Sequence, residues 1–134
     1  MTTVIRPILC SFSVIGAPAS YGAHKSKARW KNLVTVVAKT CLEKPLQIGV
    51  RIDLQIDWFS HGSRNKPDVD NILKPILDAL KNIIYIDDNQ VSSVSSRHHD
   101  LDRVLSFTDE PIHIIEPLFS GNKEYVHIRA YRVY

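Results

Sequence analysis

The chain has 134 residues, of which 44% are hydrophobic and 23% are charged, with a net charge of +3. This length and composition are typical of one globular domain spanning residues 1–134, and they exclude an intrinsically disordered chain. No apolar run approaches the roughly 20 residues that a membrane-spanning helix needs. Cys10 and Cys41 are too few for a disulfide framework and match no zinc motif. We therefore expect two buried thiols in a cytoplasmic protein.

Positive and negative charges are divided unevenly along the chain. Residues 1–66 contain ten Lys and Arg against three acids, which gives +7, whereas residues 67–134 contain seven against eleven, which gives −4. A basic half beside an acidic half suits a protein that binds phosphates with one surface and a metal ion with another. Chance clustering on a solvated surface produces the same totals.

The first half of the chain predicts a strand, a helix and a longer strand. Residues 4–15 are rich in β-branched and aromatic types and predict the first strand. Residues 29–43 have helical apolar spacing, although their run VTVV disfavours a helix. Residues 47–59 alternate between apolar and polar types. This pattern predicts a strand with one core-facing side and another side that is wet or lies at an interface.

A basic segment precedes the first helix. In SYGAHKSKARW, residues 20–30, basic and aromatic side chains are interleaved in what we expect to be a loop. Such a loop suits contacts with phosphates and stacking on bases, which makes Lys25, Lys27 and Arg29 candidate DNA-binding residues. The alternative is a solvated loop whose Trp30 packs on the core.

The second half predicts a central amphipathic helix, two further strands and a short helix. The strands are expected at residues 90–97 and 125–133, with an irregular segment at 98–110 between them. Residues 111–120 predict a helix that Gly121 ends, although Pro117 favours a break. The order β-α-β-α-β-(α)-β predicts an α+β fold: a mixed sheet of about four strands with two main helices packed on one face.

The stretch KPDVDNILKPILDALKNIIYIDDNQV, residues 66–91, contains the chemistry. At about 100° per residue, the apolar side chains of its helix lie on one side and are expected to be buried. The opposite side carries four charged residues: Asp70, Lys74, Asp78 and Lys81. Asp70 or Asn71 can cap the helix, which is the ordinary reason for an acid at this position. Pro75 means either that the first turn is irregular or that the regular helix starts near Lys74 with Pro75 at its first position.

Capping explains one acid, but not the pair Asp68 and Asp70 followed by a distant pair, Asp87 and Asp88. Clustered carboxylates without cysteine or suitably spaced histidine select a hard cation, Mg²⁺ or Mn²⁺. Carboxylates with a lysine between them suit phosphodiester hydrolysis, because bound metal ions activate water and the lysine adds a charge at the phosphate.

KPDVDNILKPILDAL followed by IDDNQV resembles the signature of the RusA-type Holliday junction resolvases. The resemblance implies a homodimeric, Mg²⁺-dependent endonuclease, without an organic cofactor, that nicks branched four-way DNA junctions symmetrically. It places the metal-binding acids at Asp68, Asp70 and Asp88 and the catalytic lysine at Lys74, with Asp87 orienting the turn. Residues 98–121 are longer than the family pattern requires.

Two other functions compete with junction resolution. One is a different Mg²⁺ enzyme, because an Asp-x-Asp pair also occurs in phosphatases of the haloacid dehalogenase type and in glycosyltransferases. In those phosphatases the pair closes an apolar strand, whereas here it follows the basic turn HGSRNKP. The other is a DNA-binding protein with a silent site.

Side chains around the acidic pairs receive simpler interpretations. We expect Asp78 to be solvated or to pair with Lys74 or Lys81, and His98-His99-Asp100 to be a polar loop rather than a metal site. His61, Arg64 and Lys66 adjoin the acids and are further candidates for phosphate contacts.

Overall fold

The computed structural model describes residues 6–18, 24–61, 69–102, 112–121 and 124–134. Its elements, in chain order, are β1 (Ile8–Ile15), α1 (His24–Lys39), β2 (Arg51–Ser60), α2 (Leu73–Leu80), the 3₁₀ helix η1 (Asp88–Gln90), β3 (Val91–Asp100), α3 (Ile112–Phe119) and β4 (Tyr125–Val133). In this part of the chain no helix is both long and apolar enough to cross a membrane.

The four strands form one mixed sheet in the order β1-β4-β2-β3. β4 is antiparallel to both neighbours, so that Ile128 lies opposite Phe12 of β1 and Ile56 of β2. β2 and β3 are parallel, which requires a crossover between them, and α2 lies in this connection. The predicted α+β fold with a mixed four-stranded sheet is therefore confirmed.

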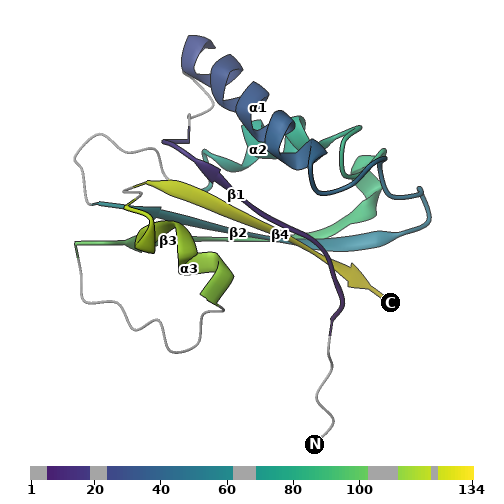
Figure 1. Ribbon diagram of the computed structural model, residues 1–134. Helices are drawn as coiled ribbons and strands as arrows, with labels where there is room; N and C mark the ends of the chain where they lie inside the picture. Colours follow the sequence, from purple (N-terminus) through teal and green to yellow (C-terminus); the bar gives the residue numbers. More distant parts are fainter. Residues whose placement is uncertain (1–5, 19–23, 62–68, 103–111, 122–123) are drawn as a thin grey trace, which may run out of the picture.

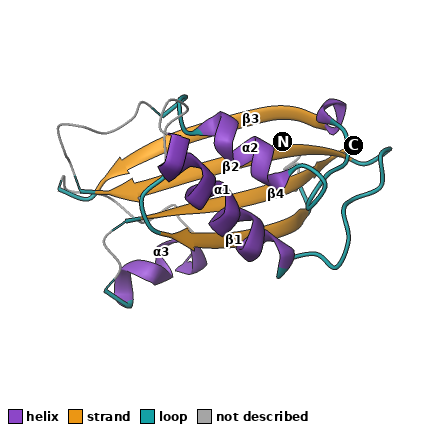
Figure 2. Cartoon of the chain, turned by 90° about the horizontal axis from the view of Figure 1, so that it is seen from above, coloured by secondary structure: helices purple, strands orange, loops and turns teal. Residues whose placement is uncertain are grey.

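α1 and α2 cover one face of the sheet, as predicted, while α3 lies on the opposite side (Figure 1). The view from above shows both covering helices lying over the strands (Figure 2). The main core fills the space between these layers with alternate residues of the central strands, among them Ile52, Leu54, Ile56 and Ile128. A smaller core on the other side joins α3 to the sheet through Phe59, Ile114, Ile115 and Tyr125.

α1 begins at His24, before the predicted start at Arg29, and ends at Lys39. The prediction of a basic loop is therefore wrong from His24 onward, and Trp30 packs on the core with only 3% of its surface exposed. Trp30, Val34 and Ala38 recur at every fourth position and are all buried. Burial of this stripe outweighs the low helix propensity of the β-branched run.

Other boundaries differ for local reasons. β2 begins at Arg51 rather than at residue 47, because a turn with a 2.9 Å hydrogen bond from Val50 N to Gln47 O precedes it. β3 continues to Asp100, so the prediction of an irregular segment from residue 98 is wrong. α3 continues through Pro117, since burial of Ile114 and Ile115 offsets the lost backbone bond.

The ends of the last two elements agree with the sequence. Gly121 follows α3 with a positive φ of 86°, and its N–H donates to Leu118 O, which confirms it as the helix stop. β4 covers the predicted residues 125–133.

The two cysteines are joined. Cys10 of β1 and Cys41, beyond the end of α1, form a disulfide with Cα atoms 5.9 Å apart. The prediction of two free thiols is therefore wrong. Because the residues lie 31 positions apart, only the packing of α1 on β1 reveals that they meet.

Candidate active site

The segment before α2 forms turns, and its acids do not cap the helix. α2 starts at Leu73 with Ile72 as its N-cap residue, and no side chain bonds to the cap. The predicted capping by Asp70 or Asn71 is therefore wrong. Asp70 contributes its backbone carbonyl, which accepts from Leu73 N at 3.3 Å, while the residue is exposed to solvent. Its carboxylate therefore remains available to a ligand.

Pro75 is the third residue of α2. The first four N–H groups of a helix have no partner within it, so proline loses no hydrogen bond here. The structure shows the late start, at Leu73, but the predicted first position for Pro75 is wrong by two residues. Lys74 Nζ lies 3.6 Å from Asp78 Oδ1, one turn on, which confirms the predicted pairing of Asp78.

Asp87 and Asp88 have different structural roles. The Asp87 side chain caps η1 by accepting from Asn89 N at 2.8 Å, and Gln90 completes a reciprocal capping box. This agrees with the expectation that Asp87 orients the turn. The Asp88 side chain is 78% exposed, and its Oδ1 lies 3.5 Å from Lys81 Nζ.

A buried glutamine holds this turn in place. Gln90 is only 2% exposed, and its side-chain oxygen accepts from the N–H groups of Ile86 and Asp87 at 2.8 and 2.9 Å. Its amide nitrogen donates to Gln47 O at 2.8 Å and to Val50 O at 3.0 Å, in the segment before β2. Gln90 therefore fixes Asp88 relative to the sheet. The sequence pattern identified it only as the start of a strand.

Lys74 and Asp88, 14 positions apart, line one open pocket of about 290 Å³. Asp78 and Tyr85 share its wall. Two carboxylates and one ammonium group thus converge on a single hollow at the junction of α2, η1 and β3. We call it the Lys74–Asp88 pocket.

Tyr85 lies in the wall of this pocket, beside its carboxylates. The side chain is buried, and its hydroxyl donates to Leu77 O at 2.9 Å. Burial, followed by the charges of Asp88 and Asp78, raises the pKa of Tyr85 to about 12. A site with this excess of carboxylate charge attracts cations.

The donor chemistry of the pocket fits a hard divalent cation, because Asp78 and Asp88 supply carboxylates and the described lining residues include no sulfur or imidazole. Asp70 is exposed, but it is not among the described residues that line the pocket. In the ranges that the structure describes, no three His, Cys, Asp or Glu residues form a ready metal cluster. The third predicted ligand, Asp68, lies outside those ranges. The grouping of Asp68, Asp70 and Asp88 stays a prediction.

The predicted DNA-binding residues lie on two segments. Lys25, Lys27 and Arg29 belong to the first turns of α1, where Lys27 is half-buried and Arg29 is exposed. Arg64 and Lys66 lie outside the described residues, while His61 pairs with Asp102 at 2.7 Å. Their contacts with DNA stay predictions.

The histidine pair is part of the sheet rather than of a polar loop. His98 and His99 belong to β3, where His98 Nε2 lies 2.6 Å from Ser60 Oγ. His99 Nε2 donates to Asp57 Oδ1 at 2.8 Å, and its ring stacks on Phe59. The predicted loop is therefore wrong, and these side chains have structural partners.

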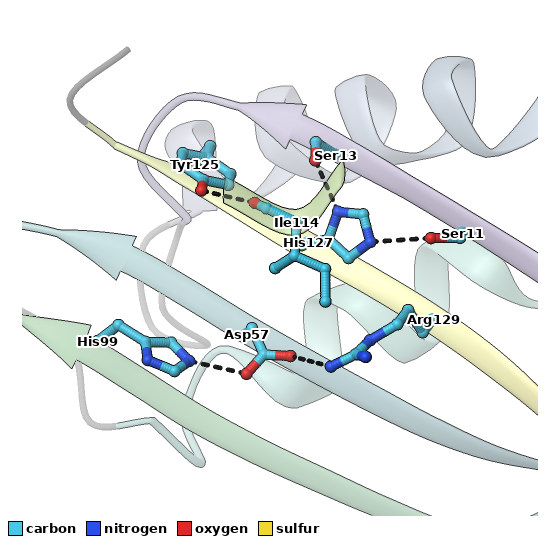
Figure 3. Close-up of polar contacts among 8 residues, drawn as sticks. All are labelled: Ser11, Ser13, Asp57, His99, Ile114, Tyr125, His127 and Arg129. Atoms are coloured by element: carbon cyan, nitrogen blue, oxygen red, sulfur yellow. Dashed lines mark hydrogen bonds and ion pairs between the residues drawn. The ribbon is translucent and has the colours of Figure 1, made fainter. Parts of the chain in front are cut away.

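Asp57 is the centre of a buried ionic cluster on the sheet face that α1 and α2 leave free (Figure 3). It is 0% exposed, although its alternation along β2 predicted a wet or interface position. Arg129 Nη2 donates to its second oxygen at 3.0 Å. Burial alone raises the pKa of Asp57, but the hydrogen bonds and charges of His99 and Arg129 outweigh it and lower the pKa.

The family model described as Endodeoxyribonuclease RusA matches residues 14–105, more than half of the chain. The match includes α1, β2, α2, η1 and β3, and with them every predicted site residue. Among curated proteins, no sequence matches this chain.

Proposed function

Because the chain belongs to the RusA family of endodeoxyribonucleases and is therefore an endonuclease that acts on DNA, we propose that it resolves four-way junctions by paired, Mg²⁺-dependent nicks. The observation that carries this proposal is the convergence of Lys74 and Asp88 from separate elements on one pocket. Phosphodiester hydrolysis needs a cation-binding carboxylate and a positive charge beside the same phosphate.

The proposed site residues are Asp68, Asp70 and Asp88 as cation ligands and Lys74 as the phosphate-facing charge. Mg²⁺, or Mn²⁺ in its place, would supply activation of the attacking water and neutralisation of the phosphate. Asp70, in the turn before α2, and Asp88, at the start of η1, are both exposed to solvent. Lys74, whose Nζ lies 3.6 Å from Asp78 Oδ1, would supply a positive charge beside the scissile phosphate, where negative charge develops in the reaction.

Two cuts on strands related by two-fold symmetry require two copies of this site, which a homodimer supplies. The dimer has a net charge of +6, twice that of one chain, and this charge favours association with DNA in the cytoplasm. Lys25, Lys27, Arg29, Arg64 and Lys66 are the proposed phosphate contacts.

The structure disfavours the phosphatase alternative. In that class the Asp-x-Asp pair closes a buried strand, whereas Asp70 lies in a turn that leads into α2, well beyond the end of β2 at Ser60. The remaining alternative is a DNA-binding protein with a silent site, which would bind the same junctions as the proposed nuclease but would not cut them.

The test is incubation with a labelled synthetic four-way junction, with and without Mg²⁺. We expect the wild type to produce symmetric nicks only with the metal, and Asp70→Asn to bind the junction without cutting it. Cleavage by Asp70→Asn at the wild-type rate would show that the site is wrong. Binding without cleavage by the wild type in Mg²⁺ or Mn²⁺ would favour the silent-site alternative.

A further inference from the structure

A second pocket lies between α1 and α2, the two helices that share one face of the sheet (Figure 2). Its volume is about 500 Å³, and Lys31 and Thr35 of α1 line it together with Asp78, Lys81 and Asn82. Asp78 also lines the Lys74–Asp88 pocket. The two hollows are therefore neighbours that share one side chain.

The two pockets differ in charge. Among the described lining residues, the Lys74–Asp88 pocket has two carboxylates and one ammonium group, whereas the α1–α2 pocket has the ammonium groups of Lys31 and Lys81 and the shared carboxylate. Lys74 lies 3.6 Å from Asp78 and offsets part of its charge. The α1–α2 pocket therefore attracts anions, and the other attracts cations.

Both lysines are accessible to an anion. Lys31 is exposed and forms no ion pair with any residue that the structure describes. Lys81 pairs with Asp88 at 3.5 Å, but the two side chains are 44% and 78% exposed. Exposed pairs of this kind contribute about 0–1 kcal/mol, so a phosphate can replace the carboxylate.

The walls that carry these lysines are fixed to one another. Thr35 Oγ1 donates to Ala79 O at 3.2 Å and joins α1 to α2. Asn82 adopts a left-handed conformation with φ of 67°, which asparagine tolerates, and its N–H donates to Tyr85 O at 2.6 Å. Hydrogen bonds therefore fix the relative positions of the segments that form the pocket.

We propose that the α1–α2 pocket binds the phosphate adjacent to the scissile phosphate of the DNA strand. The inference rests on the proposed function, since it takes the scissile phosphate to lie between Lys74 and Asp88. Successive phosphates on one strand advance only about 3.4 Å along the helix axis, so neighbouring phosphates need neighbouring sites. Lysine is suited to this contact as a point charge.

The test uses full-length protein and a junction that carries a single uncharged methylphosphonate linkage. The linkage replaces, in turn, the phosphate on each side of the cut. Binding is measured for the wild type, Lys31→Gln and Lys39→Gln. Lys39 is the matched control, because it is an exposed lysine in the last turn of the same helix and does not line the pocket.

We expect the methylphosphonate at one of the two positions to weaken junction binding by the wild type and by Lys39→Gln about three- to ten-fold. The same linkage should leave junction binding by Lys31→Gln unchanged. On the unmodified junction, Lys31→Gln should lower the salt slope of log K by about one. Equal losses for all three proteins at both positions would overturn the proposal while leaving the nuclease assignment intact. A wild type that binds no junction would overturn the proposed function, and this site with it.

Discussion

Asp87 and Asp88 are adjacent acids, of which the first has a structural role and the second is proposed to have a chemical one. Asp87 is occupied as the cap of η1, whereas Asp88 presents its carboxylate to the Lys74–Asp88 pocket. We expect Asp88→Asn to lower junction cleavage at least about a hundred-fold, since it removes a charge worth several kcal/mol to the reaction.

The matched control is Asp87→Asn, because asparagine caps a helix about as well as aspartate. Its cleavage rate in single-turnover assays should stay within about three-fold of the wild type. The opposite pattern, with Asp87→Asn inactive and Asp88→Asn active, would assign the ligand to Asp87.

Asp57 is a buried carboxylate, and its replacement leaves a second buried charge without its partner. Asp57→Asn leaves the Arg129 guanidinium, 7% exposed, without its carboxylate. Breaking a buried pair in this way costs about 3–5 kcal/mol of unfolding free energy, which urea denaturation measures. Asp53→Asn is the comparison, because its partner Arg6 is 47% exposed and the change should cost about 1 kcal/mol or less.

The same carboxylate makes stability depend on pH in acid. The pKa of Asp57 is lower in the folded protein than its value of 3.8 in the unfolded chain. Its contribution is therefore fully present above pH 3.8 and is lost as the pH falls through the folded pKa. Urea midpoints measured between pH 6 and pH 2 should decline less steeply for Asp57→Asn than for the wild type. Parallel curves would show that another group controls acid unfolding.

At the scale of elements, Gln90 joins the acidic turn to the segment before β2. Gln90→Leu removes bonds to two N–H groups and to the carbonyls of Gln47 and Val50. We expect unfolding free energy to fall by about 2–4 kcal/mol, because buried polar groups lose their partners. Cleavage should fall as well, since Asp88 loses its support.

Gln55→Leu is the matched change, because Gln55 is half-buried on β2 and its side chain makes no hydrogen bond with the described residues. Its effect on unfolding should stay below about 1 kcal/mol. If both variants unfold at the same urea concentration, Gln90 does not hold the turn.

Element types were predictable from sequence because periodicity reflects which side is buried. β4 and the apolar side of α2 follow directly from alternation and from helical spacing. The start of α1 was not predictable, since Trp30 could belong to a loop or a helix until the sheet beneath it was known. The end of β3 was not predictable for a similar reason, because the partners Ser60 and Asp57 of His98 and His99 lie on β2, far away in the sequence.

At the scale of the whole molecule, the acids and Lys74 stood out by spacing alone, but their neighbours did not. Lys31, Tyr85 and Gln90 are single residues in unremarkable local patterns, and each acts across elements. Local sequence carries no information about which side chains of α1 and α2 enclose a common pocket. The Cys10–Cys41 bond was missed for the same reason.

The proposed dimer is testable by sedimentation. One chain has a mass of 15.2 kDa, and we expect a species of twice that mass at the concentrations that resolve junctions. Its binding to DNA should weaken steeply as salt rises, because both copies release counterions from phosphates. A monomer that nicks both strands with full activity would contradict the dimer.

β4 lies between β1 and β2 although it is the last described element to be synthesised. A nascent chain that has made everything up to α3 therefore has β1 without a neighbour and β2 paired on one side only. Both strands then offer open hydrogen-bonding edges, which are sites of aggregation. During translation, the sheet closes only when β4 emerges and fills the gap, so ribosome stalling before Tyr125 would leave the chain most exposed to chaperones and proteases.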